Sequence, residues 1–91
     1  MAATLTLAPV LDLNAAAPLK AEILAHRGQD LTLDASAVER LGGLCLQVLL
    51  SAARTWAADG LNLSLGFVSQ ALTEQWAAFG APELDAEGVI A

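Results

Sequence analysis

Apolar residues along this chain follow two different spacings, which divide it into short strands and helices. Every second residue is apolar in Thr4-Leu5-Thr6-Leu7, the pattern of a half-buried strand. Between Leu44 and Ala58 the apolar residues recur every three and four positions, as in an amphipathic helix. The pattern predicts strands over 4–7, 10–13, 31–35 and 61–66, and helices over 14–27, 44–58 and 69–80.

Residues at the ends of these segments support the helix boundaries. Asn14 and Ser69 are good N-cap residues, and Gly28 is placed to end the first helix. Pro18 fits a first helical turn, which leaves open whether that helix begins at Asn14 or at Ala17.

The order of strands and helices predicts one α/β domain over residues 1–91. Strands joined through helices pair in parallel, and the first two strands add a hairpin with an antiparallel or edge strand. Because polar residues such as Thr4 and Thr32 alternate with apolar ones, one face of the sheet is exposed to water. We therefore expect a four- to five-stranded mixed sheet with helices mainly on one face, followed by an acidic tail over 83–91.

The longest predicted helix has two distinct faces. Its core-facing residues are Leu46, Leu49, Leu50, Ala53, Trp56 and Ala57, and its opposite face carries Gln47, Ser51, Arg54 and Thr55. Because an indole buries a large apolar area, we predict that Trp56 is a core residue.

Composition excludes several classes of function. The net charge is −6, and the four Lys and Arg residues are far apart in the sequence, so we expect no nucleic-acid binding and no adhesion to anionic lipid. No apolar run approaches the ~20 residues that cross a bilayer, and the N-terminus does not resemble a signal peptide. A cytoplasmic protein without membrane insertion is the expectation.

Residues that could support catalysis are few. Cys45 and His26 are the only residues of their types, so no cysteine or histidine metal cluster is expected, and packing explains both better than a catalytic pair does. Asp34, at the end of a strand, could act in a site or cap the following turn, and we favour the cap. Gly42-Gly43 lacks the lysine of a phosphate loop. We predict a non-enzyme without a cofactor or metal.

Several of these segments together resemble the core of a STAS domain. The resemblance covers about residues 5–80 and rests on Asp34-Ala-Ser36, on Val38 and Leu41, on the long helix, and on Gly60-Leu-Asn-Leu. It implies a small mixed α/β interaction module, like bacterial anti-sigma factor antagonists and STAS proteins near chemotaxis genes. Other members are the accessory subunit of a phospholipid-trafficking ABC transporter and the tails of anion transporters.

The loop before the long helix departs from the family pattern. In the antagonists it reads Asp-Ser-Ser-Gly or Asp-Thr-Ala-Gly, and a partner kinase phosphorylates its hydroxyl. The matching residues here are Gly42-Gly43-Leu44-Cys45, with glycine at position 43 in place of the hydroxyl. The resemblance therefore implies either constitutive binding or another form of regulation.

A docking surface at the start of this helix follows from its geometry. Leu44 and Val48 point away from the core-facing stripe, so we expect two aliphatic side chains facing water. The predicted partner-binding residues are Gly42, Gly43, Leu44, Gln47, Val48 and Ser51. Scattered surface apolar residues, or cover by the tail, would explain the same pattern. The expected partner is a signalling kinase, an anti-sigma factor or a response regulator, and the alternative is the ATPase of a transporter.

Overall fold

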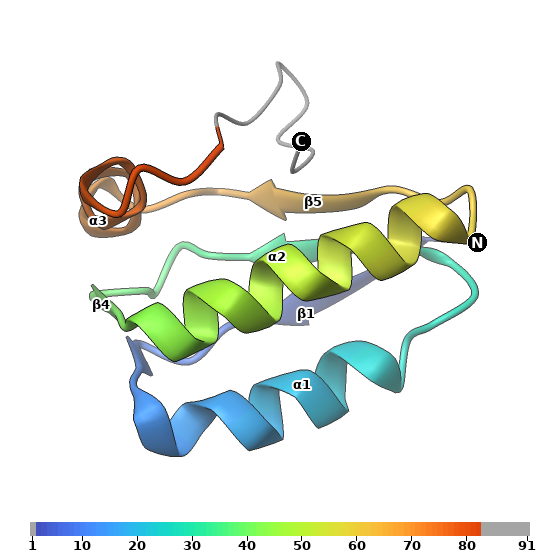
Figure 1. The fold of residues 1–91 in the computed structure, drawn as a ribbon, viewed down its shortest axis with the longest axis horizontal. Helices are drawn as coiled ribbons and strands as arrows, with labels where there is room; N and C mark the ends of the chain where they lie inside the picture. The colour runs from blue at the N-terminus through green and yellow to red at the C-terminus, as the bar shows by residue number, and fades with distance from the viewer. Residues whose placement is uncertain (1, 83–91) are drawn as a thin grey trace.

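The computed structural model describes residues 2–82 and has an α/β fold (Figure 1). Its elements are the strands β1 (Ala2–Thr6) and β2 (Val10–Leu11), the 3-10 helix η1 (Leu13–Ala15), the helix α1 (Ala16–Leu24), the strands β3 (Asp30–Asp34) and β4 (Arg40–Leu41), the helix α2 (Gly43–Ala58), the strand β5 (Leu63–Gly66) and the helix α3 (Gln70–Ala78). The predicted fold class is confirmed. The predicted acidic tail lies outside the described residues.

Five strands form two sheets in which every described pair is parallel. The larger sheet has the order β1-β3-β5, with Leu5, Leu33 and Leu65 in register. The smaller sheet pairs β2 with β4, Val10 opposite Arg40. The expected antiparallel hairpin of the first two strands does not form, because β2 pairs with a strand that follows α1 and β3.

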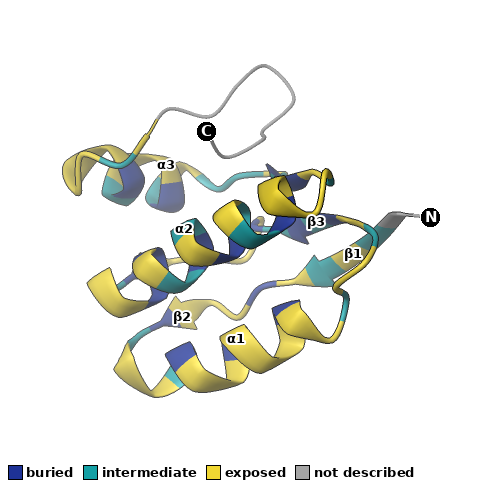
Figure 2. Cartoon of the chain, turned by 45° about the vertical axis from the view of Figure 1, so that its right-hand side comes forward, coloured by how far each residue is buried: buried dark blue, intermediate teal, exposed yellow. Residues whose placement is uncertain are grey.

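One face of the larger sheet is apolar and the other is polar. Leu31 and Leu33 of β3 are buried, and α1 and α2 lie side by side over their face of the sheet (Figures 1 and 2). On the opposite face Thr32 and Ser64 share a hydrogen bond of 3.3 Å between their hydroxyl oxygens, and Thr4 is exposed. The alternation in the sequence thus correctly predicted one covered face. The third helix, α3, packs against β4 instead.

The core combines leucines from the strands with the inner face of α2. The buried residues of α2 are Cys45, Leu46, Leu49, Ala52 and Trp56. Trp56 is 0 % exposed, which confirms its predicted core position. Ala57 is exposed and Ala52 is buried, so the inner face is turned slightly from the predicted one.

The first helix begins differently from the prediction. Asp12 is the N-cap of η1, where its side chain accepts hydrogen bonds from the N–H groups of Asn14 (3.0 Å) and Ala15 (3.1 Å). Asn14 is therefore inside the first turn and is not its cap. Ser69 does cap α3 as predicted, accepting a hydrogen bond of 3.1 Å from the N–H of Leu72.

The strand β4 was not predicted, and a side chain of α3 holds it. The side-chain amide of Gln75 accepts a hydrogen bond from the Leu41 N–H at 2.6 Å and donates one to the Glu39 carbonyl oxygen at 2.9 Å. Gln75 therefore bonds the free edge of this two-residue strand and fixes α3 against it.

Candidate functional site

The start of α2 is held close to β2, and this explains one of its two glycines. The Gly42 N–H donates to the Leu11 carbonyl oxygen at 2.8 Å, and the Gly42 carbonyl accepts the first helical bond from Leu46. A Cβ at position 42 would lie 3.1 Å from that Leu11 oxygen, tighter than an ordinary contact. The close approach of the two backbones therefore favours glycine at position 42.

Gly43 is under no such constraint. It is the first residue of α2 and is exposed, and a Cβ there would meet only the Cε1 atom of Phe79, at 3.8 Å. That distance is an ordinary van der Waals contact. A side chain at this position would therefore fit the backbone that the glycine now forms.

A groove of about 260 Å³ runs between α1 and α2. Its lining comprises Lys20, Ile23 and Leu24 from α1 with Leu44, Gln47, Val48, Ser51, Ala52 and Thr55 from α2. Leu24 is 41 % exposed and Leu44 is 45 % exposed, so an aliphatic side chain from each helix is open to solvent at this groove. We call these lining residues the docking groove.

Four of the six predicted partner-binding residues line the docking groove: Leu44, Gln47, Val48 and Ser51. Gly43 is exposed at the start of the same helix, whereas Gly42 is half-buried behind it against β2. Val48 corrects the expectation of two aliphatic residues facing water, because it is half-buried and packs against the core. Leu44 is thus the exposed member of the pair.

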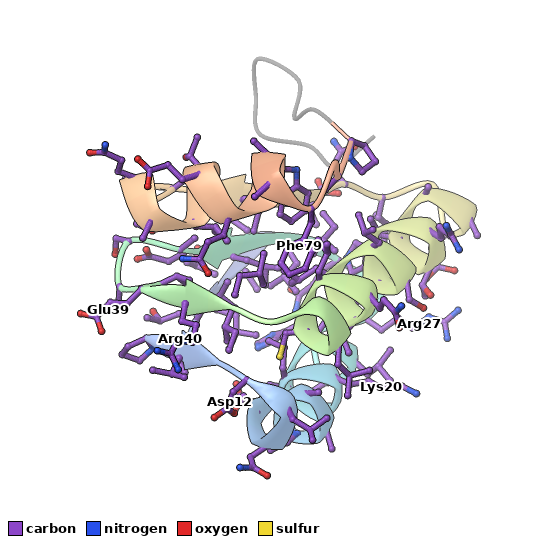
Figure 3. The ribbon with its side chains drawn as sticks, turned by 60° about the vertical axis from the view of Figure 1, so that its left-hand side comes forward. Asp12, Lys20, Arg27, Glu39, Arg40 and Phe79 are labelled. Carbon is purple, nitrogen blue, oxygen red and sulfur yellow. The ribbon has the colours of Figure 1, made fainter. Side chains whose placement is uncertain are left out.

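Sequence reasoning missed the contributions of the other two helices. Lys20 and Leu24, four residues apart on α1, form the opposite wall of the groove. Phe79, predicted to continue the core stripe of α3, is 49 % exposed and extends toward the first turn of α2 (Figure 3). The i, i+4 spacing on α1 could have indicated a shared face, but which helix it would meet depends on packing.

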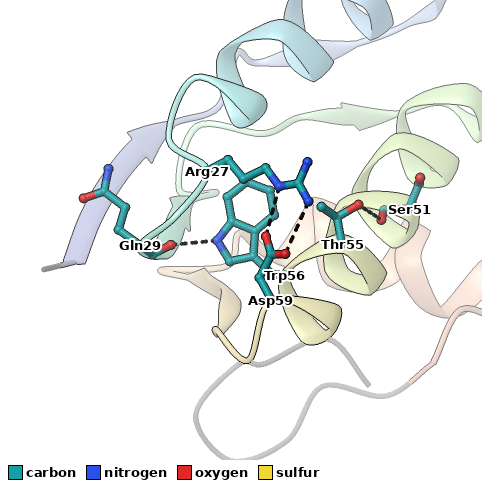
Figure 4. A network of polar contacts seen from close by, with 6 residues as sticks. All are labelled: Arg27, Gln29, Ser51, Thr55, Trp56 and Asp59. Carbon is teal, nitrogen blue, oxygen red and sulfur yellow. Dashed lines mark hydrogen bonds and ion pairs between the residues drawn. The ribbon is translucent and has the colours of Figure 1, made fainter.

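The polarity of the groove is simple. Lys20 is its one charged lining side chain among the described residues, and Gln47, Ser51 and Thr55 are neutral. The Thr55 hydroxyl donates to the Ser51 carbonyl oxygen within α2 at 3.2 Å (Figure 4). The groove therefore offers an apolar floor, one positive charge and amide or hydroxyl groups along its edge.

An ion pair joins the ends of the two helices that form the groove. Arg27, just after α1, contacts Asp59, just after α2, with 3.0 Å from Nε to Oδ2 and 3.3 Å from Nη2 to Oδ1 (Figure 4). The hydrogen bond from Arg27 lowers the pKa of the Asp59 carboxyl. Because the pair is exposed, its effect is to orient the turns, with little expected stabilisation.

The residues considered for catalysis have structural roles. The Asp34 carboxylate accepts a hydrogen bond from the Ser36 N–H at 3.0 Å, which lowers its pKa and caps the turn as favoured from the sequence. Cys45 is buried, with its thiol donating to the Asp12 carbonyl oxygen at 3.2 Å. Burial is the main cause of its raised pKa, with the negative charge of Asp12 adding to it. A protonated buried thiol is a poor nucleophile.

Metal ligands are not clustered in the part of the chain that the structure describes. Among residues 2–82 no three His, Cys, Asp or Glu side chains come together as a metal site would require. No helix within the same range is both long and apolar enough to cross a membrane. The described surface features thus point to a docking role, which is the work of an interaction module.

Comparison with protein families identifies which kind of module this is. Residues 1–86 match the family model described as "Mlab, STAS domain", so the chain belongs to this STAS family. STAS domains are in general non-catalytic modules that mediate protein–protein interactions. Searches of the curated proteins and of the solved structures found no significant match.

Proposed function

We propose that this chain is a non-catalytic STAS module of bacterial signal transduction, of the anti-sigma-antagonist or chemotaxis-associated type. It acts in the cytoplasm by reversible docking of a protein partner in the docking groove beside Gly43. The observation that carries the proposal is the exposure of Leu44 on a groove shared by two helices, next to the turn that related domains use as their switch.

The docking groove has the composition of a small interface. Exposed aliphatic side chains such as Leu24 and Leu44 lie at its centre, and polar groups such as Gln47 and Ser51 lie around them. Apolar anchors surrounded by polar residues are typical of surfaces where a few residues supply most of the binding free energy. Phe79 extends the apolar surface past Gly43 toward α3.

A second candidate function is that of an accessory subunit docked on the ATPase of a transporter. The residue at position 43 favours it, since a permanently docked subunit needs no phosphorylatable hydroxyl and glycine supplies none. The same groove would serve, so the two candidates differ in the partner and not in the surface.

Affinity capture with matched variants tests both. The wild-type chain, the Leu44→Glu variant and the Leu13→Glu control are each used to retain proteins from the source cells. Leu13 is 73 % exposed and lies outside the groove, so the control makes the same chemical change on another surface. The expected partner is retained by the wild type and by the control but is lost with Leu44→Glu.

The identity of that partner decides between the candidates. A kinase, an anti-sigma factor or a response regulator supports the signalling role, and a transporter ATPase supports the second. Equal retention by all three chains would contradict docking in this groove.

A further inference from the structure

A second cavity, of about 470 Å³, lies beside α3 and shares no lining residue with the docking groove. It is lined by Leu65, Val68, Leu72, Thr73, Trp76, Ala77 and Ala81. Only Thr73 and Trp76 bring polar side-chain atoms to this lining, and the Trp76 indole N–H is already bonded to the Pro82 carbonyl oxygen at 2.7 Å. The cavity therefore suits an apolar occupant that carries no charge into it.

The backbone after α3 returns to the rim of this cavity. Gly80 has a φ of +69°, a conformation that reverses the chain and that side chains rarely adopt. The Ala81 N–H then donates to the Trp76 carbonyl oxygen at 3.3 Å, and the bond from the Trp76 indole holds Pro82. Residue 83 consequently starts beside the cavity.

The sequence that follows has the pattern of an extended segment with two unlike faces. In Glu83-Leu84-Asp85-Ala86-Glu87 an acidic residue alternates with an apolar one. In an extended chain such alternation places Leu84 and Ala86 on one side and the three carboxylates on the other. At ~3.3 Å per residue, the segment can span the cavity without strain.

We propose that the occupant of the cavity is the chain's own segment 83–91, which crosses it with Leu84 and Ala86 facing α3. The carboxylates of this segment face water, which an uncharged cavity requires of them. Attachment at Pro82 gives the segment an effective concentration on the order of millimolar, which an unlinked apolar peptide would rarely reach. The edge of α3 farthest from the docking groove is thereby closed by the chain itself.

A cysteine placed in the cavity lining reports on this cover. Thr73 is exposed in the described residues and lines the cavity, and the native Cys45 is fully buried, so the rate of thiol labelling in Thr73→Cys reports position 73. Ending the chain after Pro82 should raise this rate about tenfold or more, the factor equivalent to about 1.4 kcal/mol of cover. A Gln70→Cys control, exposed on the same helix but outside the cavity lining, should label equally fast in both chain lengths.

A point variant keeps the test independent of how well the shortened chain folds. In the full chain, Leu84→Asp should raise the labelling rate of Thr73→Cys as shortening does, while Glu83→Gln should leave it low. An unchanged rate in either the shortened chain or the Leu84→Asp chain would overturn the proposal. Protection that is lost on dilution of the full chain would also overturn it, since a second copy would then be the occupant.

Discussion

The indole Nε1 of Trp56 donates a hydrogen bond of 2.8 Å to the backbone carbonyl oxygen of Gln29 (Figure 4). Trp56 lies in the last turn of α2 and is fully buried, while Gln29 precedes β3. A single side chain thus fills the core and satisfies a backbone acceptor in the turn that leads into the central strand. Its substitution removes both contributions together.

We expect Trp56→Ala to lower the free energy of unfolding by ~3–5 kcal/mol, the range for deleting a large buried aromatic side chain. Trp56→Phe should cost less, because it retains most of the ring and loses only the bond to Gln29. Chemical denaturation of both variants measures the two effects. An unchanged unfolding midpoint for Trp56→Ala would show that the indole does not support the core.

Two substitutions in the docking groove should separate binding from folding. Leu44→Glu changes an exposed residue and should alter stability by no more than ~0.5 kcal/mol, yet weaken partner binding by ~2 kcal/mol or more if Leu44 is a central anchor. Val48→Glu should be clearly destabilising, because Val48 is half-buried against the core. Thermal melting and a binding titration are needed for each. A Val48→Glu variant as stable as Leu44→Glu would mean that α2 is rotated from the position described.

The two glycines before α2 should respond in opposite ways. Gly43→Ser places its Cβ 3.8 Å from Phe79 and should be tolerated within ~0.5 kcal/mol. Gly42→Ala places its Cβ 3.1 Å from the Leu11 carbonyl oxygen, which the Gly42 N–H itself holds, and should cost ~1–3 kcal/mol as overpacking does. Melting midpoints of the two variants test the contrast, and equal midpoints would contradict it. The hydroxyl of the related domains is thus compatible with this backbone.

Acid should weaken the fold partly through Asp34. The N–H of Ser36 holds the pKa of this carboxyl below its ordinary value of 3.8, so its contribution is fully present at neutral pH. As the pH falls below about 4, the unfolded chain takes up the proton first, and stability is lost until the folded carboxyl is protonated too. Asp34→Asn keeps an oxygen acceptor but does not titrate, so its melting temperature should fall less steeply over this range. Parallel curves for the two proteins would show that Asp34 does not contribute.

Local sequence patterns predicted the elements whose signals lie within a few residues. The cap at Ser69 is formed by Leu72, three positions away, and the inner face of α2 follows from helical periodicity. The start of the first helix was wrong because Asp12 and Asn14 are both good caps and only the geometry of the 3-10 turn chooses between them.

Long-range pairing could not be predicted in the same way. The strand β4 is two residues long and has no periodicity of its own, and its partners are Leu11 in the chain before it and Gln75 after it. The α1 wall of the docking groove has the same origin. Lys20 and Leu24 belong to it only because α1 packs beside α2.

The bond between Gln75 and β4 has a consequence for how this part of the molecule opens. The N–H of Leu41 is covered by a side chain of α3 and not by a neighbouring strand, so its exchange with solvent hydrogen requires α3 to leave β4. Leu41 is followed directly by Gly42 and Gly43, where α2 begins. Detachment of α3 would therefore free one side of the segment that sets the position of the docking groove. The protection of this single amide is a measure of how rigidly the groove is held.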